Sequence, residues 1–495
     1  MPGHRLRLFA TALSLSALLV APSGAATEDE IRAILADRIE RAKRSVGIVV
    51  GLVNADGTTV VGHGRRGLDD PLTPDGDTVF EIGSVSKVFT AILLADMAAN
   101  GKVEIGAPAA SYLPDSVDMP GAIDDPVTLY HLTTHTSGLP RMPDNFAPAD
   151  PNNPYADYSV QQMYDFFSAH ELSRAPGETV EYSNLAVGLL GHILAEASDL
   201  DYESLVKERI TGPLEMSDTA ITLSTDIRAR LAAGHSFGLS PGASLVPAAN
   251  WDIPTLAGAG GLRSTVNDMM RFVAANLGLT ATELAPAMAN THESRENMGP
   301  EGMQVGLGWL NTTQHGLTIT WHNGQTGGYH SFVGFDKEHG KGVVVLSNAE
   351  SSIDDIGFHL LDSRFELATV EPVQTTSTVP DSPAGRALTR WVQVTRGSNQ
   401  EAARTHYEEA FHESFRTAVP LESYMGARDQ LRGLLSSVEM NHFVARDDHD
   451  LSAYVESNGT WFAIHLQVQP DEPYEILGLL GQPSDPPAEP DRERQ

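Results

Sequence analysis

The stretch FEIGSVSKVFTAILL, residues 80–94, places a serine and a lysine three residues apart at the start of an apolar helix. Residues i and i+3 lie on one face of a helix, so Lys87 is expected beside Ser84. A serine hydroxyl is a poor nucleophile unless a base lies within hydrogen-bonding distance. Burial lowers the pKa of a lysine, and the neutral amine can then act as that base. The alternative is a serine near a helix start, followed by a lysine that reaches solvent.

Three features of the chain favour the chemical interpretation. It contains only six lysines, yet one of them occupies this helix. The helix N-terminus also supplies backbone N–H groups that stabilise negative charge developing on a substrate. Large apolar side chains surround Lys87 in the sequence and leave it little contact with solvent: Phe80, Ile82, Val88, Phe89, Ile92 and Leu93. Taken by itself, the stretch still leaves both interpretations open.

The composition is that of a large, acidic protein. The 495 residues are too many for one ordinary domain, and with 41% hydrophobic residues two folded domains are expected. The formal net charge of -32 gives a surface that repels nucleic acid and anionic lipid. The absence of cysteine excludes disulfides, thiolate metal sites and a cysteine nucleophile. We expect no nucleic-acid partner, no cofactor and no metal; the composition does not indicate an oligomeric state.

The N-terminus has the pattern of a secretory signal peptide. Arg5 and Arg7 precede an apolar run over 8–20 that is too short to span a bilayer comfortably, and small residues at 23–26 are suited to cleavage. The pattern predicts a signal peptide over 1–25, a periplasmic or secreted location, and no membrane anchor after cleavage. A retained N-terminal anchor is the alternative.

The order of helical and strand patterns predicts an α+β fold. An amphipathic helix over 27–45 is followed by two β-rich runs that flank Asp56-Gly57, which is typical of a hairpin. A long region with helical stretches comes next, and residues 317–350 have the pattern of three antiparallel strands. We therefore expect one domain over 27–366, with a sheet assembled from both of its ends.

A second, smaller unit is expected after this domain. Residues 367–386 are rich in Pro, Thr and Ser and are predicted to be a linker. A helical pattern over 387–410 and several strand patterns up to residue 482 predict a small α+β accessory domain over 387–482. It weakly resembles NTF2-like or cystatin-like domains and carries no evident catalytic set. The last residues, 483–495, are predicted to be disordered.

Further stretches, taken together with residues 84–87, resemble the signatures of one family. LYHLTTHTSGLP is found at 129–140; PGETVEYSNLAVGLLGHIL, at 176–194, contains Tyr182-Ser183-Asn184; and WHNGQTGGYHSFVGF, at 321–335, contains His322-Asn323-Gly324. Their order and spacing resemble those of class C β-lactamases and D,D-carboxypeptidases of the penicillin-binding serine hydrolases. The resemblance covers roughly residues 28–365 and implies an antiparallel sheet flanked by helices, with a helical subdomain.

The resemblance also implies a role for each motif residue. Ser84 would be acylated by the substrate carbonyl, and Lys87 and Tyr182 would share its proton and later deliver one to the leaving group. The backbone N–H groups of Ser84 and Gln325 would form the oxyanion hole. The substrate-binding residues implied by the resemblance are Asn184, His322, Asn323, Gly324 and Gln325.

The third signature motif, His322-Asn323-Gly324, departs from the family pattern, which usually has Lys-Thr/Ser-Gly at this position. A lysine there supplies a permanent positive charge for a substrate carboxylate, whereas His322 is expected to be mostly neutral at pH 7. His-x-Gly resembles relatives that act as D-aminopeptidases, D-amino-acid amidases or esterases; packing of His322 on the strand edge is the structural alternative. The glycines Gly324, Gly327 and Gly328 are predicted to let the backbone approach a ligand closely.

The sequence as a whole predicts a secreted serine hydrolase that forms an acyl-enzyme at Ser84. Its substrates would contain amide or ester bonds of the β-lactam or D-amino-acid peptide type. A carboxylesterase of the same fold is one alternative. The other is a penicillin-binding sensor or scaffold without turnover, which the filled catalytic positions disfavour.

Overall fold

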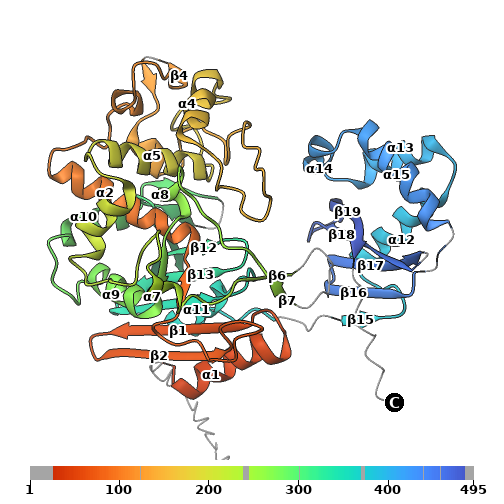
Figure 1. Ribbon diagram of the computed structural model, residues 1–495, viewed down its shortest axis with the longest axis horizontal. Coiled ribbons are helices and arrows are strands. Elements are labelled where there is room, and N and C mark those ends of the chain that lie inside the picture. Colours follow the sequence, from red (N-terminus) through yellow and green to blue (C-terminus); the bar gives the residue numbers. More distant parts are fainter. Residues whose placement is uncertain are drawn as a thin grey trace, which may run out of the picture.

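The computed structural model describes residues 26–122, 124–237, 245–299, 302–369, 374–436, 438, 440–457 and 459–484. The predicted signal peptide and residues 485–495 of the predicted tail lie outside these residues. The described chain forms two units, each with its own hydrophobic core (Figure 1). Within the described ranges, no helix has the length and apolar character needed to cross a membrane.

The first unit is built on an eight-stranded antiparallel sheet in the order β2-β1-β14-β13-β12-β11-β10-β9 (Figure 1). Strand β1 (Gly47–Asn54) pairs with β14 (Lys341–Ser347), which confirms the predicted sheet built from both ends of this unit. Its other strands are β2 (Gly57–Gly64), β9 (Glu296–Asn297), β10 (Met303–Val305), β11 (Leu310–Gln314), β12 (Leu317–Gln325) and β13 (His330–Asp336).

Helices cover both faces of this sheet. Helices α1 (Glu28–Ala36) and α11 (Asp354–Leu361) pack on the face that carries Ile48, while α2 (Ser86–Ala99) and α9 (Val266–Asn276) belong to the core on the face that carries Val49. Successive side chains of a strand point to opposite faces. Because both faces are covered, β1 is apolar along its length without alternation, as its sequence predicts.

A helical region lies between β2 and β9 in the sequence, and α2 lies at its centre with buried residues around its circumference. The remaining α-helices are α3 (Leu129–Thr133), α4 (Val160–Ala169), α5 (Asn184–Glu196), α6 (Tyr202–Val206), α7 (Thr225–Arg228), α8 (Ala257–Gly260) and α10 (Ala285–His292). The 3₁₀ turns are Gly83–Val85 and Ala109–Tyr112, and the π-helical turns are Asp37–Arg41 and Lys207–Thr211. Short strands pair as β3 (Val79–Glu81) with β8 (Arg263–Thr265), β4 (Gly121–Ala122) with β5 (Asp125–Pro126), and β6 (His235–Phe237) with β7 (Leu245–Pro247).

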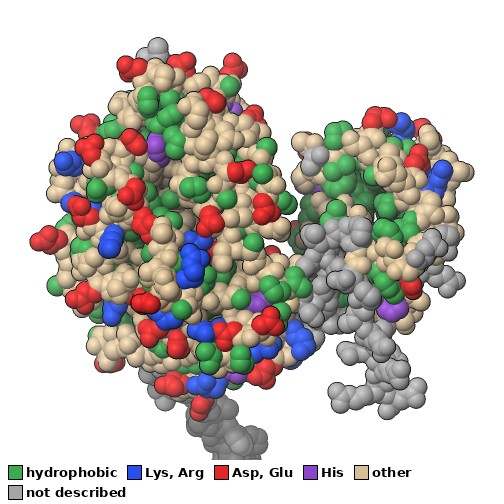
Figure 2. Space-filling model, in the orientation of Figure 1, with side chains coloured by type: hydrophobic (Ala, Val, Ile, Leu, Met, Phe, Trp, Pro, Cys, Tyr) green, Lys and Arg blue, Asp and Glu red, His purple; other side chains and the backbone are tan. Residues whose placement is uncertain are grey.

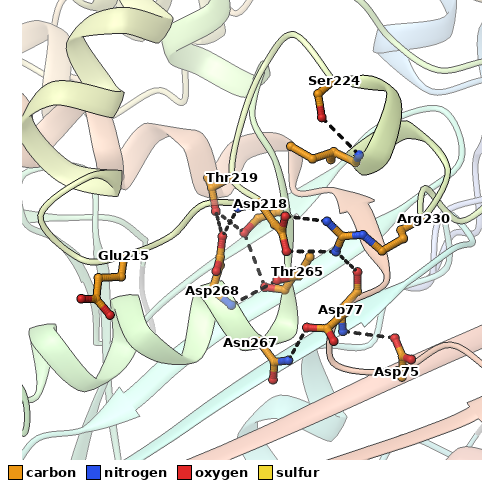
Figure 3. Close-up of polar contacts among 12 residues, drawn as sticks. Asp75, Asp77, Glu215, Asp218, Thr219, Ser224, Arg230, Thr265, Asn267 and Asp268 are labelled. Atoms are coloured by element: carbon orange, nitrogen blue, oxygen red, sulfur yellow. Dashed lines mark hydrogen bonds and ion pairs between the residues drawn. The ribbon is translucent and has the colours of Figure 1, made fainter.

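Hydrogen bonds connect Asp218, in the loop before α7, with Asp77, which directly precedes the segment that leads to Ser84 (Figure 3). Buried Asp268 on α9 accepts a hydrogen bond from the backbone N–H of Asp218 at 2.8 Å. The guanidinium of Arg230 donates to Asp218 Oδ2 at 2.9 Å and to the carbonyl oxygen of Asp77 at 2.7 Å. A carboxylate and a guanidinium are therefore paired directly beside β3, the strand that precedes Ser84.

The second unit is a five-stranded antiparallel sheet, in the order β15-β16-β17-β18-β19, packed against helices (Figure 1). Its core contains Trp391, Phe411, Leu451 and Ile464. Its elements are β15 (Gln374–Thr376), α12 (Pro383–Arg396), α13 (Gln400–Ala410), α14 (Glu413–Ala418), α15 (Leu421–Leu435), β16 (His442–Asp447), β17 (Asp450–Ser457), β18 (Thr460–Val468) and β19 (Ile476–Ser484).

The start of this unit differs from the sequence prediction. The predicted linker over 367–386 contains β15, which pairs with β16, and the first turn of α12. Ser382 accepts a hydrogen bond from the backbone N–H of Gly385 at 3.1 Å and caps α12, so the local sequence encodes a helix start. The helix predicted over 387–410 is two helices, because α12 ends at Arg396, directly before Gly397, and Asn399 caps α13.

Candidate active site

Ser84 lies in a tight turn between β3 and α2. Gly83 has a φ of 49°, which favours glycine, and a Cβ there would lie 2.8 Å from the backbone nitrogen of Gln325. Glycine therefore lets the Ser84 turn lie directly against β12. The α-helix itself begins at Ser86, and its N-cap position is Val85. Ser84 is thus not the capping residue of this helix.

Lys87 is completely buried, and its amine has three polar neighbours. Nζ lies 2.9 Å from Ser84 Oγ, 2.9 Å from Asn184 Oδ1 and 2.7 Å from the carbonyl oxygen of Ala259. The alternative in which this lysine reaches solvent is therefore wrong. The structure brings Ser84, Lys87 and Asn184 together as the sequence predicts.

Burial lowers the pKa of Lys87 well below its usual range, and the nearby charge of Arg141 lowers it further. A neutral amine has two N–H donors and one lone pair. The two donors match the oxygens of Asn184 and Ala259, and the lone pair then faces the hydroxyl of Ser84. This arrangement can remove the Ser84 proton.

Tyr182 is half-buried beside this pair. Its ring centroid lies 4.8 Å from Lys87 Nζ, 5.2 Å from Cζ of Arg141 and 4.5 Å from the ring of His135, on which it stacks. Burial raises the pKa of Tyr182; a hydrogen bond with Ser84 and the charge of Arg141 oppose this rise only in part. Tyr182 is therefore protonated at neutral pH and can donate a proton, whereas Lys87 is the better base.

His135 has a structural role that also orients Tyr182. Its Nδ1 accepts a hydrogen bond from the backbone N–H of Ser183 at 3.2 Å, and burial lowers its pKa well below the usual range. The backbone of His135 has a φ of 61°, a left-handed conformation uncommon for residues other than glycine. Stacking against this fixed ring restricts the orientation of Tyr182.

His322 lies on β12 with its ring centroid 6.4 Å from that of Tyr182. Its Nδ1 is 2.5 Å from the carbonyl oxygen of Asn323 and donates to it, which leaves a lone pair on Nε2. Nε2 is buried and has no hydrogen-bond partner among the described residues. Burial and the neighbouring Lys87 lower the pKa of His322 to about 4. His322 is therefore neutral, and it is buried beneath the described cleft lining, which contains Asn323, Gly324 and Gln325 but not His322.

The end of β12 provides an open strand edge. Strand β11 pairs with β12 only as far as Trp321, so residues 322–325 have no pairing with β11 on that side. Thus only this last part of β12, and not the whole strand, forms an edge. Gln325 lines the cleft here and lies close to Gly83, which places its backbone N–H near Ser84. An extended amide substrate can bind along such an edge through backbone hydrogen bonds.

The glycines of the third motif serve the protein's own packing. A Cβ at Gly324 would lie 2.0 Å from the carbonyl oxygen of Ile82, and one at Gly327 would lie 2.7 Å from Nε1 of Trp251. A Cβ at Gly328 would meet the backbone of Gly234 at 2.8 Å. Gly324 and Gly327 also line the cleft, so close approach of their backbone to a ligand stays a prediction, whereas Gly328 is not among the described lining residues.

Asn323 belongs to the cleft lining, but its amide is engaged with an acid. Its Nδ2 donates to Asp354 Oδ2 at 2.6 Å, and His330 Nε2 lies 2.9 Å from Asp354 Oδ1. The carboxylate of Asp354 is thus close to the strand edge at the point where a substrate would bind. A negative charge here disfavours a second carboxylate from a substrate.

The cleft around Ser84 has a volume of about 660 Å³, in the range of ligand sites. Tyr155 and Trp251 form part of its wall, with ring centroids 5.3 Å apart, and Arg141 also lines it. Trp251 is held by Glu81, which accepts from its backbone N–H at 3.0 Å. These wall residues could not be predicted from the sequence, because they lie in loops whose only signal is an aromatic or basic residue within a Pro-, Gly- and Asp-rich segment.

Comparison with known proteins adds family relationships to this geometry. A family model described as β-lactamase matches residues 30–360, while residues 374–484 lie outside this match. The D-alanyl-D-alanine-carboxypeptidase/endopeptidase AmpH of Escherichia coli K12 is 32% identical over 238 residues, which cover 48% of this chain and 59% of AmpH. The chain thus matches less than two thirds of the length of that relative.

A β-lactamase of Pseudomonas fluorescens is 28% identical over 340 residues, covering 61% of this chain and 88% of the relative. The solved structure of a class C β-lactamase from Rhodobacter sphaeroides covers 67% of this chain and 98% of its own, with a TM-score of 0.57 and 24% identity. The fold predicted for the first unit is therefore confirmed. The resemblance of the second unit to NTF2-like domains stays a prediction.

Proposed function

Because the chain belongs to the β-lactamase family, we propose that it is a serine hydrolase that forms an acyl-enzyme at Ser84. The observation that carries the proposal is the buried Lys87 amine, 2.9 Å from Ser84 Oγ and with a lowered pKa. The amine takes the hydroxyl proton while Oγ attacks the substrate carbonyl carbon, and the carbonyl electron pair moves onto oxygen. The N–H groups of Ser84 and Gln325 stabilise that oxyanion.

The tetrahedral intermediate then collapses and expels an amine or an alcohol. The leaving group needs a proton, which passes to it from the Lys87 ammonium through the hydroxyl of Tyr182. The raised pKa of Tyr182 supports this role, because a protonated phenol can donate to the leaving group and be reprotonated by the ammonium. Water attacks the acyl-enzyme in the second half, and the neutral Lys87 accepts its proton. The Lys87 ammonium then returns this proton to Ser84 Oγ as the acyl–oxygen bond breaks and the carboxylic acid product leaves.

The substrate proposed is an amide or ester of the β-lactam or D-amino-acid peptide type. The named relatives, β-lactamases and a D-alanyl-D-alanine carboxypeptidase, support this class. An aromatic wall containing Tyr155 and Trp251 suits an apolar acyl group. Secretion is also part of the proposal and rests on the signal-like pattern of residues 1–25.

A second candidate, a carboxylesterase of the same fold, is favoured by the neutral His322. With Asp354 beside the same strand edge, this part of the cleft lacks the positive charge that a substrate carboxylate needs. Arg141 is the only lysine or arginine in the described cleft lining, and it lies on the Tyr182 side. Substrates without a carboxylate at the β12 edge are therefore expected to react fastest.

Covalent labelling tests the nucleophile. Wild type, Ser84→Ala and the exposed control Ser116→Ala are incubated with a fluorophosphonate or a labelled penicillin, and intact mass is followed over time. We expect a single adduct on wild type and Ser116→Ala, and none on Ser84→Ala. Labelling of Ser84→Ala at the wild-type rate would rule out Ser84 as the nucleophile.

A substrate panel tests turnover and subclass. Nitrocefin, p-nitrophenyl esters and D-alanyl p-nitroanilide are compared by kcat/KM. Hydrolysis of nitrocefin or the anilide supports the β-lactam or D-peptide class, while hydrolysis of the esters alone identifies a carboxylesterase. A covalent adduct that forms but never turns over with any substrate would instead support a sensor or scaffold.

A further inference from the structure

The Ser84 cleft contains one basic side chain that takes no part in the proposed proton transfers. Arg141 lies in the loop between α3 and α4 and lines the cleft together with Ser84. Its carbonyl oxygen accepts hydrogen bonds from the backbone N–H groups of Asn184 and Leu185, at 3.1 and 3.3 Å, at the start of α5. The backbone of Arg141 is thereby fixed to a helix, and its guanidinium carbon lies 5.2 Å from the centre of the Tyr182 ring.

The guanidinium of Arg141 is accessible and unpaired. Arg141 is exposed, and its side-chain nitrogens make no hydrogen bond or ion pair with any described residue. The only carboxylate in the described cleft lining is that of Glu350, which accepts a hydrogen bond from the backbone N–H of Phe237 at 2.8 Å. A guanidinium keeps its charge and presents parallel N–H donors that match the two oxygens of a carboxylate. Arg141 therefore offers a charged set of donors to an anion that enters the cleft.

The two sides of the cleft carry opposite charges. On the side of the sheet, the Asp354 carboxylate accepts a hydrogen bond from Asn323 beside the β12 edge. The helical region contributes Arg141, the only lysine or arginine in the described lining. Figure 2 shows acidic side chains spread over the visible surface of the first unit, with fewer lysines and arginines among them, in keeping with the net charge of -32. A substrate carboxylate is therefore repelled at the β12 edge and attracted at Arg141.

Arg141 lies beside the wall that the proposed function assigns to the acyl group. Burial raises the pKa of Tyr155, and the nearby charge of Arg141 opposes this rise, as does a hydrogen bond with Asn184. Tyr182 spans the distance from Arg141 to the nucleophile, since its ring contacts the guanidinium and its hydroxyl interacts with Ser84. The guanidinium and Ser84 are thus about one tyrosine side chain apart, a distance that a chain of a few carbon atoms can cover.

We propose that Arg141 is the specificity-determining residue of this cleft, and that it selects esters or amides whose acyl group ends in a carboxylate. The carboxylate accepts hydrogen bonds from the guanidinium, the acyl carbonyl carbon lies at Ser84 Oγ, and the carbon chain between them packs against Tyr155. Recognition of the carboxylate thus lies on the helical side of the cleft and not at His322. This inference rests on the proposed acylation of Ser84 and names the substrate class of that reaction.

The test compares two p-nitrophenyl esters, one of glutaric acid and one of glutaric acid monoamide, in which a neutral amide of nearly the same size replaces the free carboxylate. Spontaneous hydrolysis of each ester is subtracted, and the ratio of kcat/KM, acid over amide, is the readout. We expect a ratio above one in wild type. It should fall about two- to fivefold in Arg141→Gln, as loss of an exposed ion pair implies, and further in Arg141→Glu, whose new carboxylate repels the substrate. Raising the salt concentration should lower the wild-type ratio, because salt screens the ion pair.

Arg32→Gln is the matched control, since Arg32 is an exposed arginine on α1 outside the described cleft lining, and its ratio should be that of wild type. An unchanged ratio in Arg141→Gln would overturn the proposal. An equal fall of kcat/KM for both esters would overturn it as well, because Arg141 would then act through Tyr182 and not on the substrate.

Fluorophosphonate labelling separates failure of this inference from failure of the proposed function. Intact mass shows whether either ester acylates Ser84. If neither ester does so and the fluorophosphonate still labels Ser84, the nucleophile stands and the carboxylate-bearing substrate class is rejected. If the fluorophosphonate does not label Ser84 either, the proposed hydrolase fails, and this inference fails with it.

Discussion

Lys87 in the first unit and Arg428 in the second are both buried basic residues, but their surroundings differ. All the hydrogen-bonding capacity of a neutral Lys87 amine is used by Ser84, Asn184 and Ala259. Arg428 has carboxylate and carbonyl partners on Nη1 and Nη2, while its Nε–H has none in the described residues. Burial of both side chains is nearly complete.

The difference follows from acid–base chemistry. Desolvation of an ammonium is relieved by loss of a proton, so burial turns a lysine into a base. A guanidinium keeps its charge, so burial turns an arginine into a fixed donor that requires an acceptor. We therefore assign proton transfer to Lys87 and a structural role to Arg428, and the following predictions test this contrast.

The largest effect is expected from Lys87→Met, which removes the base and keeps an unbranched side chain. We expect kcat/KM to fall by about 10²–10⁴-fold, the usual contribution of a general base. The exposed Lys43→Met is the matched control and should behave as wild type. Stopped-flow or steady-state hydrolysis of the best substrate measures the effect. Wild-type kcat/KM in Lys87→Met would exclude Lys87 as the base.

The pH dependence of the free energy of unfolding is expected to distinguish the buried Lys87 from the buried Arg428. The pKa of Lys87 is lowered in the folded chain, so between that value and the ordinary lysine value of 10.5 the unfolded chain binds one proton more. Stability contributed by this site therefore rises with pH through this window, by about 1.4 kcal/mol per pH unit, and is lost as pH falls. Urea unfolding at pH 7 and pH 9 should show this rise in wild type relative to Lys87→Met.

Arg428→Met serves as the contrast in the same experiment. A guanidinium stays protonated in both states, so the stability difference between wild type and Arg428→Met should not change between pH 7 and pH 9. If the Lys87→Met difference is equally flat, the buried amine is not neutral in the folded chain. Complete urea curves are required at each pH. The dependence of the unfolding free energy on urea concentration must be the same for wild type and variants before their stabilities can be compared.

A smaller effect is expected from His322→Lys, which places an amine at the β12 edge whose charged form a substrate carboxylate would stabilise. Charge-assisted hydrogen bonding to a carboxylate is worth about 1.5–3 kcal/mol, so kcat/KM for nitrocefin should rise about ten- to a hundredfold relative to a p-nitrophenyl ester. His322→Gln is the neutral control and should leave this ratio unchanged. An equal change in both variants would mean that the charge at this position does not select the substrate.

The smallest effect is expected from Glu81→Gln, which neutralises the partner of another buried arginine. Glu81 accepts hydrogen bonds from Asn250 Nδ2 at 3.0 Å, the backbone N–H of Trp251 at 3.0 Å and Arg263 Nη2 at 3.2 Å. We expect the free energy of unfolding to fall by about 1 kcal/mol and KM to rise more than kcat falls, because Trp251 is part of the cleft wall.

The exposed Glu104→Gln is the matched control for this last variant, and it should change neither stability nor KM. Urea unfolding and Michaelis–Menten kinetics with an aromatic ester measure both effects. A loss of kcat at constant KM in Glu81→Gln would contradict the proposed role, since it would indicate an effect on the reaction centre instead of on the wall.

The sequence by itself determined the features that depend on local spacing. The i, i+3 relation of Ser84 and Lys87 follows from helix geometry, and the apolar character of β1 follows from burial on both faces. The order of the three motifs was sufficient to predict the family and the fold. The lowered pKa of Lys87 could also be predicted, because apolar neighbours in the sequence exclude water from that helix.

Only the tertiary structure decided which distant segments meet. Tyr155 and Trp251 come from loops separated by nearly a hundred residues, and their contact gives no periodic signal. The hydrogen bond between Asn323 and Asp354 depends on how α11 packs on the sheet. That Arg428 Nε has no partner among the described residues depends on which backbone carbonyls reach the guanidinium. Short-range periodicity fixes the direction of neighbouring side chains, whereas the partner of a buried polar group is set by the packing of the whole chain.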